Sequence, residues 1–385
     1  MPEAVIVDAV RTPIGRAFKG SLKDVRADEL AAVPLKALQD RNPDVNFSET
    51  TDVLMGAASG VGEQGYNVGR NAALLAGIDH HVPACTLNRF CASSLQTIRM
   101  AFHAIQAGEG DQYIAAGVES VSRAGLGAGM SDEQKHPKLS GGDGSLFDVY
   151  IPMGMTAENV AERCKVSREA QDEWAVISQN RAVDARDKGH FDKEIVPVPA
   201  PEGEVTRDDG PRPGTTMEVL ATLKPAFRED GSVTAGNSCP LNDGAAAVLV
   251  MSEEKAKSLG LKPKVKILAS SVAAIRPEIM GLGPIPAIQA VLKDSGMSMD
   301  DIDVVEINEA FAAQIVPCKE ELGISDDKLN PFGGAIALGH PFGMTGARIM
   351  TTLINDLETL DAQYGIESMC VAGGMGMAML VERLN

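Results

Sequence analysis

The sequence lacks several features, and each absence excludes a class of protein. Only 6 cysteines occur among 385 residues and none forms a C-x-x-C pair, which argues against a disulfide scaffold, a zinc ribbon and a thioredoxin-type motif. Lysine and arginine number 35 against 53 acidic residues, so at a net charge of −18 neither nucleic acid nor an anionic membrane is an expected partner. No apolar run approaches the ~20 residues of a membrane span, and neither a signal peptide nor a peroxisomal tripeptide is visible. We therefore expect a cytoplasmic protein, in a compartment that keeps its thiols reduced, without membrane insertion.

The pattern along the chain predicts an α/β fold of two or three domains. Short apolar runs alternate with helical periodicity in the first and last thirds, an order that predicts a mainly parallel sheet covered by helices. The predicted strands cover residues 5–10, 53–58, 84–87, 113–118, 265–272, 302–307, 366–371 and 377–381. The predicted helices cover residues 28–38, 71–76, 93–107, 285–292, 310–322 and 346–357. Cys91 and His340 each precede a helix and then an apolar strand, which favours a duplicated unit over two unrelated α/β domains.

The middle of the chain, residues 120–233, has a different composition. It is rich in glycine, proline and charge, and one clear helix is predicted at 169–188. An insertion of this length in a compact protein is usually functional, so we expect a lid or a ligand-binding arm. The alternative, a flexible linker, is less favoured because apolar pieces such as residues 195–198 occur within it.

Cys91 is a candidate nucleophile. It lies in the segment NRFCASS, between a predicted strand and a predicted helix. A thiol at a helix N-terminus is favoured as thiolate by the helix dipole, and the free N–H groups there could stabilise an oxyanion. From position alone, a buried and inert cysteine is an equally good interpretation.

His340 is a candidate base. The segment Asn330–Arg348, NPFGGAIALGHPFGMTGAR, places it in a glycine-rich turn before a helix, whereas the other five histidines look like ordinary loop or helix residues. Because these glycines do not form a G-x-G-x-x-G after a strand, a dinucleotide site is a weak interpretation.

Two further residues occupy strand ends. Cys370, in MCVAGGMGM, could be a second reactive thiol beside a pocket of backbone N–H groups, or simply a buried strand cysteine. Asn308, in NEAF, stands at a strand-to-helix junction and could be a helix N-cap or a site residue.

Taken together in their order and spacing, these segments resemble the thiolase family over essentially the whole chain. The motifs that carry the resemblance are VDAVRTPIGR, NRFCASS, GMTAENVAE, TAGNSCPLNDGAAA, GPIPA, NEAFAAQ, GGAIALGHPFGMTGAR and CVAGGMG. The resemblance implies duplicated βαβαβαββ units in a five-layered α/β/α/β/α arrangement, with a long insertion after the first half. It implies an N-terminal domain of residues 1–119 plus about 234–262, a CoA-binding loop domain at 120–233 and a C-terminal domain at 263–385.

The resemblance also implies a reaction, the thiolytic cleavage of 3-ketoacyl-CoA to acetyl-CoA and a shortened acyl-CoA. Cys91 would be the acylated nucleophile, His340 would activate it and bind the enolate oxygen, and Cys370 would be the general acid and base. Asn308 would hold a water in the oxyanion site shared with His340. The backbone N–H groups of Cys91 and Ala372 would form a second oxyanion hole. No metal and no permanently bound cofactor are implied, and coenzyme A is a substrate.

Residues for binding CoA and the acyl group also follow from the resemblance. Arg212 would contact the adenine nucleotide and Cys239 the pantetheine, while a channel would be lined by Met153, Met280 and Phe311. A −18 chain must hold the CoA phosphates with local cations such as Arg212, so CoA affinity should depend on these arginines and on salt.

This sequence departs from the family pattern at three positions. Cys239 stands where many thiolases have serine, Pro240 where glycine or alanine is commoner, and Ala372 where many have glycine. The last change would add strain if the position needs a positive φ. These departures affect substrate preference rather than the class of reaction.

The segment Ile151–Gly154, IPMG, helps to choose a branch of the family. Short-chain acetoacetyl-type thiolases tend to have histidine before Met-Gly, so this sequence resembles the degradative branch, in fatty-acid or related β-oxidation. A homodimer or homotetramer is implied, and a hydratase or dehydrogenase of β-oxidation is a candidate partner. The alternatives are biosynthetic acetoacetyl-CoA formation, a condensing enzyme of the ketoacyl synthase type, and a non-enzymatic lipid-carrying relative. The condensing enzyme would not use a second cysteine such as Cys370, and the non-enzymatic relative would lack a catalytic residue.

Overall fold

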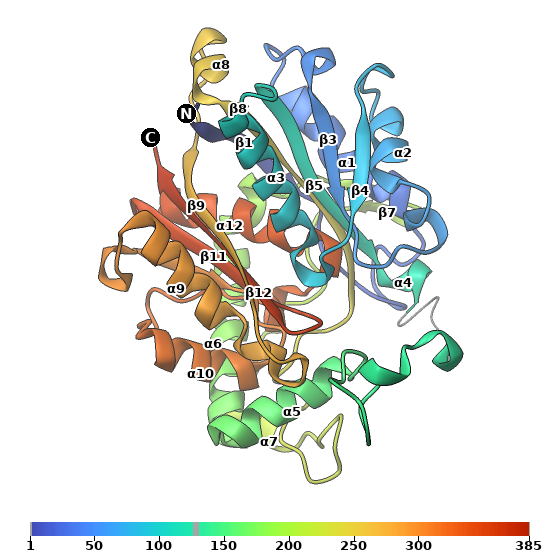
Figure 1. Cartoon of the computed structure of the whole chain (residues 1–385), viewed down its shortest axis with the longest axis vertical. Coiled ribbons are helices and arrows are strands. Elements are labelled where there is room, and N and C mark those ends of the chain that lie inside the picture. Colours follow the sequence, from blue (N-terminus) through green and yellow to red (C-terminus); the bar gives the residue numbers. More distant parts are fainter. Residues whose placement is uncertain (1, 126–130, 385) are drawn as a thin grey trace.

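One large mixed sheet runs through the molecule (Figure 1). The computed structural model describes residues 2–125 and 131–384, and its main sheet has the strand order β10-β11-β12-β9-β1-β8-β5-β3-β4, with β2 paired to β8. The strands of the main sheet are β1 (Ala4–Arg11), β2 (Gly15–Arg16), β3 (Asp52–Gly56), β4 (Ala84–Leu87), β5 (Gln112–Ser120), β8 (Asn242–Ser252), β9 (Val265–Ala274), β10 (Val304–Ile307), β11 (Tyr364–Val371) and β12 (Met375–Arg383).

The sheet consists of two halves with the same internal order. In the first half the neighbours run β3-β5-β8-β1, and in the second they run β10-β11-β12-β9. A short antiparallel contact joins the halves, in which Val5 of β1 faces Lys266 of β9 and Ile6 faces Val265. The first and second pairs of each series match in direction as well, because β3–β5 and β10–β11 are parallel whereas β5–β8 and β11–β12 are antiparallel.

The prediction of a mainly parallel sheet is wrong. Only the pairs β3–β4, β3–β5 and β10–β11 of the main sheet are parallel, and the other pairings are antiparallel. Strand β8, which is missing from the predicted strands, is buried along its whole length and pairs antiparallel with β1, β2 and β5. Strand β12 follows β11 after the short turn 372–374, and a turn of that length can join only antiparallel neighbours.

Helices cover both outer faces and fill the space between the halves. The helices of the two halves are α1 (Ala27–Arg41), α2 (Val68–Leu75), α3 (Ser93–Ala107), α8 (Glu253–Ser258), α9 (Pro284–Ser295), α10 (Ala312–Leu322), α11 (Ala335–Leu338) and α12 (Thr345–Thr359). Helices α1 and α2 pack on the first half, and α9 and α10 pack on the second. Helices α3 and α12 contact each other in the middle; α3 packs on the first half of the sheet, whereas α12 packs on strands of both halves.

The contact between α3 and α12 is close. Leu95, Ile98, Phe102 and Ile105 give α3 a buried stripe at helical spacing, and the helix ends at Gly108 with φ 75°. A Cβ atom at Gly346 would lie 2.2 Å from the backbone nitrogen of Leu95, so no side chain fits at this crossing. The two helices thereby hold the two halves in one fixed arrangement.

The described part of the insertion packs against both halves, since two of its helices contact α10 whereas its Val198 lies in the apolar core of the first half. It contains α4 (Val121–Ala124), α5 (Met153–Cys164), α6 (Arg168–Asp187), α7 (Met217–Ala221) and a hairpin of β6 (Val198–Ala200) and β7 (Gly203–Val205). The helix predicted at 169–188 is confirmed as α6, whose Trp174 is buried and donates from Nε1 to Glu309 at 3.0 Å. Helices α5 and α7 extend the molecule at the bottom of Figure 1. The alternative of a flexible linker is therefore wrong for the described part of the insertion.

In the described part of the chain, no helix is both long enough and apolar enough to cross a membrane.

Three buried carboxyl groups lie in the second half around Arg348 of α12. Glu306, Asp356 and Glu367 are at most 1% exposed, and burial raises the pKa of each well above its ordinary value. A raised carboxyl pKa means that the folded state holds protons that the unfolded chain has lost, so stability falls as pH rises above about 5. We expect the free energy of unfolding to fall between pH 6.5 and 8, by about 1.4 kcal/mol per pH unit for each carboxyl that stays protonated.

Urea unfolding at several pH values measures this slope. Glu367→Gln should make it shallower, because an amide carries no titrating proton. The exposed Glu254 provides the matched control, and Glu254→Gln should keep the wild-type slope. An unchanged slope in Glu367→Gln would show that its carboxyl is ionised in the folded protein.

Candidate active site

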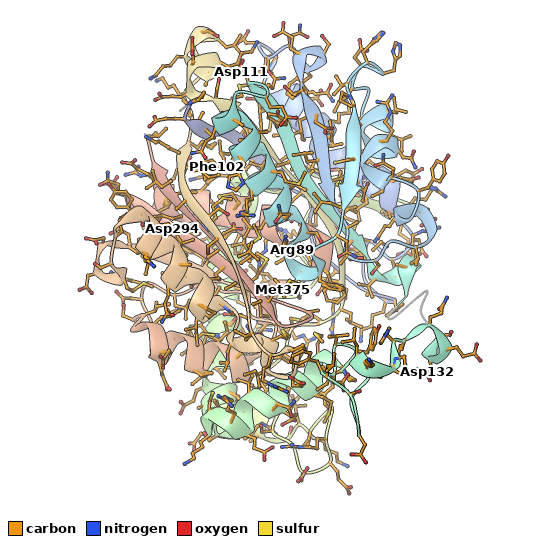
Figure 2. The ribbon with its side chains drawn as sticks, in the orientation of Figure 1. Arg89, Phe102, Asp111, Asp132, Asp294 and Met375 are labelled. Carbon is orange, nitrogen blue, oxygen red and sulfur yellow. The ribbon has the colours of Figure 1, made fainter. Side chains whose placement is uncertain are left out.

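Cys91 is presented by a tight turn between β4 and α3. The turn is a short 3-10 helix, Phe90–Ala92, and Phe90 has the unusual φ of 48°. Ser93 fixes this conformation, since its Oγ donates to the carbonyl of Phe90 at 2.7 Å and accepts from the N–H of Arg89 at 2.9 Å. Arg89 is labelled near the middle of the molecule in Figure 2. Strain at a residue adjoining a candidate nucleophile is typical of a functional turn.

The helix N-terminus, which favours a thiolate, does not dominate at Cys91. Cys91 is only 8% exposed, and burial raises the pKa of its thiol well above the ordinary value, helped by the nearby thiols of Cys370 and Cys239. A hydrogen bond from the backbone N–H of Ala372 acts in the opposite direction but is outweighed. The sequence shows the helix N-terminus but not this burial. As a nucleophile, Cys91 would therefore start as a thiol and would need a base.

His340 has the properties of that base. It lies between α11 and the short 3-10 helix Phe342–Met344, and its backbone N–H donates to Oδ1 of Asn242 at 2.9 Å. Its Nδ1 lies 2.6 Å from Oγ1 of Thr345, whose own proton goes to the carbonyl of Pro341 at 2.8 Å. Nδ1 must therefore carry the ring proton, which leaves a lone pair on Nε2. Burial lowers the pKa of His340 to about 3, so the ring is neutral and can accept a proton.

Asn308 follows β10 and faces His340. Its Nδ2 lies 3.3 Å from Nε2 of His340, and its N–H donates to the carbonyl of Ser368 at 2.9 Å. The N-cap of α10 is Phe311, so the alternative that Asn308 is a helix N-cap is wrong. Oδ1 of Asn308 is buried and has no hydrogen-bond partner within residues 2–125 and 131–384. Such an acceptor beside a base is suited to an ordered water, which can donate to it.

Cys370 lies at the end of β11 and is completely buried. Its Sγ donates to Oε1 of Gln314 at 3.1 Å. Burial raises the pKa of Cys370 to about 11, although hydrogen bonding with Gln314 and with its own backbone acts against the rise. Positive φ angles in the following turn belong to Gly373 and Gly374, and Ala372 is not among the non-glycine residues with positive φ. The change of glycine to alanine at 372 therefore adds no strain.

One cavity of about 580 Å³ brings the candidate catalytic residues together. Its lining comprises Cys91, Pro152, Met153, Gly154, Phe227, Cys239, Leu241, Met280, Ala310, Phe311, His340, Phe342 and Cys370. The candidate residues Met153, Met280, Phe311 and Cys239 thus lie in the same cavity as the two candidate thiols and the candidate base. Phe227 and Phe342 also line it without having been singled out from the sequence; Phe342 belongs to the motif around His340, whereas Phe227 lies outside every motif quoted above.

Arg212 does not line this cavity. It lies at a second cavity of about 240 Å³, where its backbone N–H donates to Oε1 of Gln179 at 2.9 Å. Burial and the charge of Arg16 lower the pKa of Arg212. The second cavity is also lined by Ser238 and Pro240, the neighbours of Cys239, so residues 238–240 separate the two cavities.

Comparison with known proteins gives one consistent result. The thiolase N-terminal domain matches residues 4–254 and the thiolase C-terminal domain matches residues 261–383. A β-ketoadipyl-CoA thiolase of Acinetobacter baylyi is 48% identical and a 3-ketoacyl-CoA thiolase of Klebsiella pneumoniae is 45% identical, each aligned over 100% of both chains. The crystal structure of the Bacillus anthracis acetyl-CoA acetyltransferase superposes with a TM-score of 0.91 at 42% identity, covering 100% of this chain and 99% of that one. The chain therefore belongs to the thiolase family.

Proposed function

We propose that this protein cleaves 3-ketoacyl-CoA thiolytically, giving acetyl-CoA and an acyl-CoA shortened by two carbons. The observation that carries the proposal is the meeting of two thiols and one neutral imidazole, those of Cys91, Cys370 and His340, in one apolar cavity. Cleavage of a carbon–carbon bond needs a nucleophile, a base for that nucleophile and an acid for the carbon that leaves. The names of relatives at 45–48% identity support the same reaction.

The first half-reaction forms an acyl-enzyme. His340 Nε2 accepts the proton of Cys91 as its sulfur attacks the 3-keto carbon, and the backbone N–H of Ala372, already directed at Cys91, is placed to stabilise the oxyanion. The bond between carbons 2 and 3 then breaks, and its electrons form the enolate of acetyl-CoA. Cys370 protonates the enolate carbon while Asn308 and His340 hold its oxygen through a water. Each such donor is worth about 3 kcal/mol in the transition state.

The second half-reaction releases the product. The Cys370 thiolate left by the first half-reaction takes the proton of an incoming CoA thiol. The CoA sulfur attacks the acyl group on Cys91, and the sulfur of Cys91 leaves and recovers its proton from His340. Protons and thiols are thereby restored, so no metal or redox cofactor is needed to balance the cycle.

The second cavity supports a place for CoA. Arg212 lies there beside a segment shared with Cys239, so a ligand could pass from Arg212 over residues 238–240 to the catalytic thiols. Arg16, whose charge acts on Arg212, adds a second cation near this place. These local arginines would hold the phosphates against the net charge of −18.

The acyl group should be uncharged. Apart from His340 and three thiols, every residue that lines the catalytic cavity is apolar or glycine. A terminal carboxylate, as in a β-ketoadipyl group, would lose its hydration there without a cation to replace it. The lining therefore supports substrates with an alkyl end, in fatty-acid or related β-oxidation, even though relatives of both kinds have similar identities.

A thiolysis assay tests the proposal. We expect kcat/KM for 3-ketohexanoyl-CoA to exceed that for 3-ketoadipyl-CoA, which has the same six-carbon acyl chain, by about tenfold or more. Longer chains and a ring-bearing substrate complete the series and define the acyl limit. Equal efficiency on the two six-carbon substrates would contradict the uncharged acyl group, and failure to cleave any member of the series would contradict thiolysis itself. Acetoacetyl-CoA formation from acetyl-CoA, the alternative direction of the same chemistry, is measured with the same enzyme.

Domain organisation and assembly form a further part of the proposal. The repeated strand order and the central α3–α12 pair support duplicated βαβαβαββ units in five α/β/α/β/α layers. We divide the chain into an N-terminal domain (1–119 and about 234–262), a CoA-binding insertion (120–233) and a C-terminal domain (263–385).

Strand β4 is an edge of the main sheet, and the segments on either side of it in the sequence carry the exposed apolar side chains of Phe90, Tyr66, Leu74 and Leu75. Such an edge supports a homodimer or homotetramer. The six cysteines are all free thiols, which supports a location in the cytoplasm, where a hydratase or dehydrogenase of β-oxidation could be a partner.

A further inference from the structure

Gln314 contacts Cys370 but has no role in the reaction described so far. It lies in the first turn of α10 and is fully buried. Its Oε1 accepts the proton of Cys370 Sγ at 3.1 Å, and its backbone N–H donates to the carbonyl of Phe311 at 3.1 Å. A Cβ atom at Gly281 would lie 2.9 Å from Cβ of Gln314, so the backbone of the segment 277–282 packs directly against this side chain. The amide is thus held next to the thiol.

The other end of the same amide is unused. Nε2 of Gln314 is buried and has no hydrogen-bond partner in the part of the chain that the structure describes. A buried NH₂ group without a hydrogen-bond partner is unfavourable, so we expect Nε2 to donate a hydrogen bond at some stage of the reaction. Cys370 itself offers that partner, because its sulfur must exist as a thiol at one stage of the cycle and as a thiolate at another.

The two states of the sulfur need opposite partners. A thiol donates and is matched by the carbonyl oxygen of the amide, whereas a thiolate accepts and is matched by the NH₂ group. The last torsion of a glutamine side chain is broad and roughly two-fold, so a half-turn exchanges Oε1 for Nε2 without moving the rest of the residue. One glutamine can therefore serve both states, which an apolar or a carboxylate side chain cannot.

We propose that Gln314 is a positioning residue that alternates between accepting from the Cys370 thiol and donating to the Cys370 thiolate. The proposal rests on the proposed function for the need to alternate, while the contact itself does not depend on it. Gln314 neither gains nor loses a proton. The proton of Cys370 goes to the enolate carbon in the first half-reaction and is replaced from the CoA thiol in the second.

Other groups around Cys370 affect the same equilibrium and must be kept constant. The titratable side chains that face it are Cys91 from the turn before α3, Cys239 from the loop before β8, Cys318 from α10 and His340 from the loop after α11. All four groups belong to other residues, so a substitution of Gln314 removes none of them.

The test uses two variants of Gln314. Gln314→Met keeps the length of the side chain but can neither accept strongly nor donate, and Gln314→Glu places a carboxylate beside the sulfur. The direct measurement is the pH dependence of alkylation of Cys370 by iodoacetamide, followed on its own peptide by mass spectrometry. We expect the pH midpoint to move upward in both variants, further in Gln314→Glu, and kcat for thiolysis to fall about tenfold or more with KM nearly unchanged.

A control separates this role from packing. Gln171 on α6 is also a fully buried glutamine, hydrogen-bonded to Ser232 at 2.9 Å, and Gln171→Met should leave the alkylation midpoint of Cys370 unchanged. A midpoint that stays at the wild-type value in both Gln314 variants, whatever happens to their stability, would overturn the proposal. The alkylation measurement needs no thiolase turnover, so its outcome is independent of whether the proposed function holds.

Discussion

Replacing Cys91 with alanine should abolish thiolysis, with kcat lower by a factor on the order of 10⁵. The reason is that an alanine cannot form the acyl-enzyme, and the residual oxyanion and base groups have no covalent intermediate to act on. The measurement has two parts, steady-state thiolysis and the mass of the protein after incubation with a 3-ketoacyl-CoA. The wild-type protein should gain the mass of one acyl group, and the variant should gain none.

A second cysteine of the same region provides the matched control. Cys85 lies on β4, six residues before Cys91, is half-buried and does not line the catalytic cavity. Cys85→Ala should keep both turnover and acyl labelling. Full acylation of Cys91→Ala would show that another residue is the nucleophile, and the remaining thiols of the cavity, Cys239 and Cys370, would be the candidates.

Cys370→Ala should slow both half-reactions while the nucleophile stays in place. Without the thiol, the enolate carbon is left to be protonated by water, and the incoming CoA keeps its proton. General acid and base catalysis of this kind is worth 10²–10⁴-fold, so we expect kcat to fall by about 10³-fold. Rapid mixing with a 3-ketoacyl-CoA, followed by quenching, measures acyl-enzyme formation, and addition of CoA to preformed acyl-enzyme measures the second step.

Cys318 is the control for this variant. It is buried on α10 and lies close enough to Cys370 for the charge of Cys370 to raise the pKa of Cys318, yet it does not line the cavity. Cys318→Ala should therefore retain turnover. If Cys370→Ala cleaved substrate at nearly the wild-type rate, the acid and base role would belong to another group, and His340 would be the remaining candidate in the cavity.

Much of this arrangement could be predicted from the sequence because it is local. Helix α3 follows from the spacing of Leu95, Ile98, Phe102 and Ile105, and its end from Gly108. The positions of Cys91 and His340 at turns before helices are also local features. Strand direction was not predictable in the same way, because β8 is buried on both faces and pairs with strands far away in the sequence.

The protonation states could not be predicted, because they depend on burial in the folded protein. A helix N-terminus favours a thiolate at Cys91, yet the surrounding apolar cavity outweighs it. The tautomer of His340 depends on Thr345, five residues later, whose proton is directed to Pro341. Gln314 gives no signal at all in the sequence beyond its place in NEAFAAQ, since only the fold brings it to Cys370.

The close crossing of α3 and α12 has a consequence for how the chain can evolve. Cys91 belongs to the first half, whereas Asn308, His340 and Cys370 belong to the second, so neither half contains a complete set of reacting groups. The cavity exists only where the halves meet, and Gly346 against Leu95 fixes how they meet. The two halves are therefore not free to diverge independently, as the halves of many duplicated proteins are. A change at the crossing is selected by its effect on a reaction whose groups lie on both sides of it.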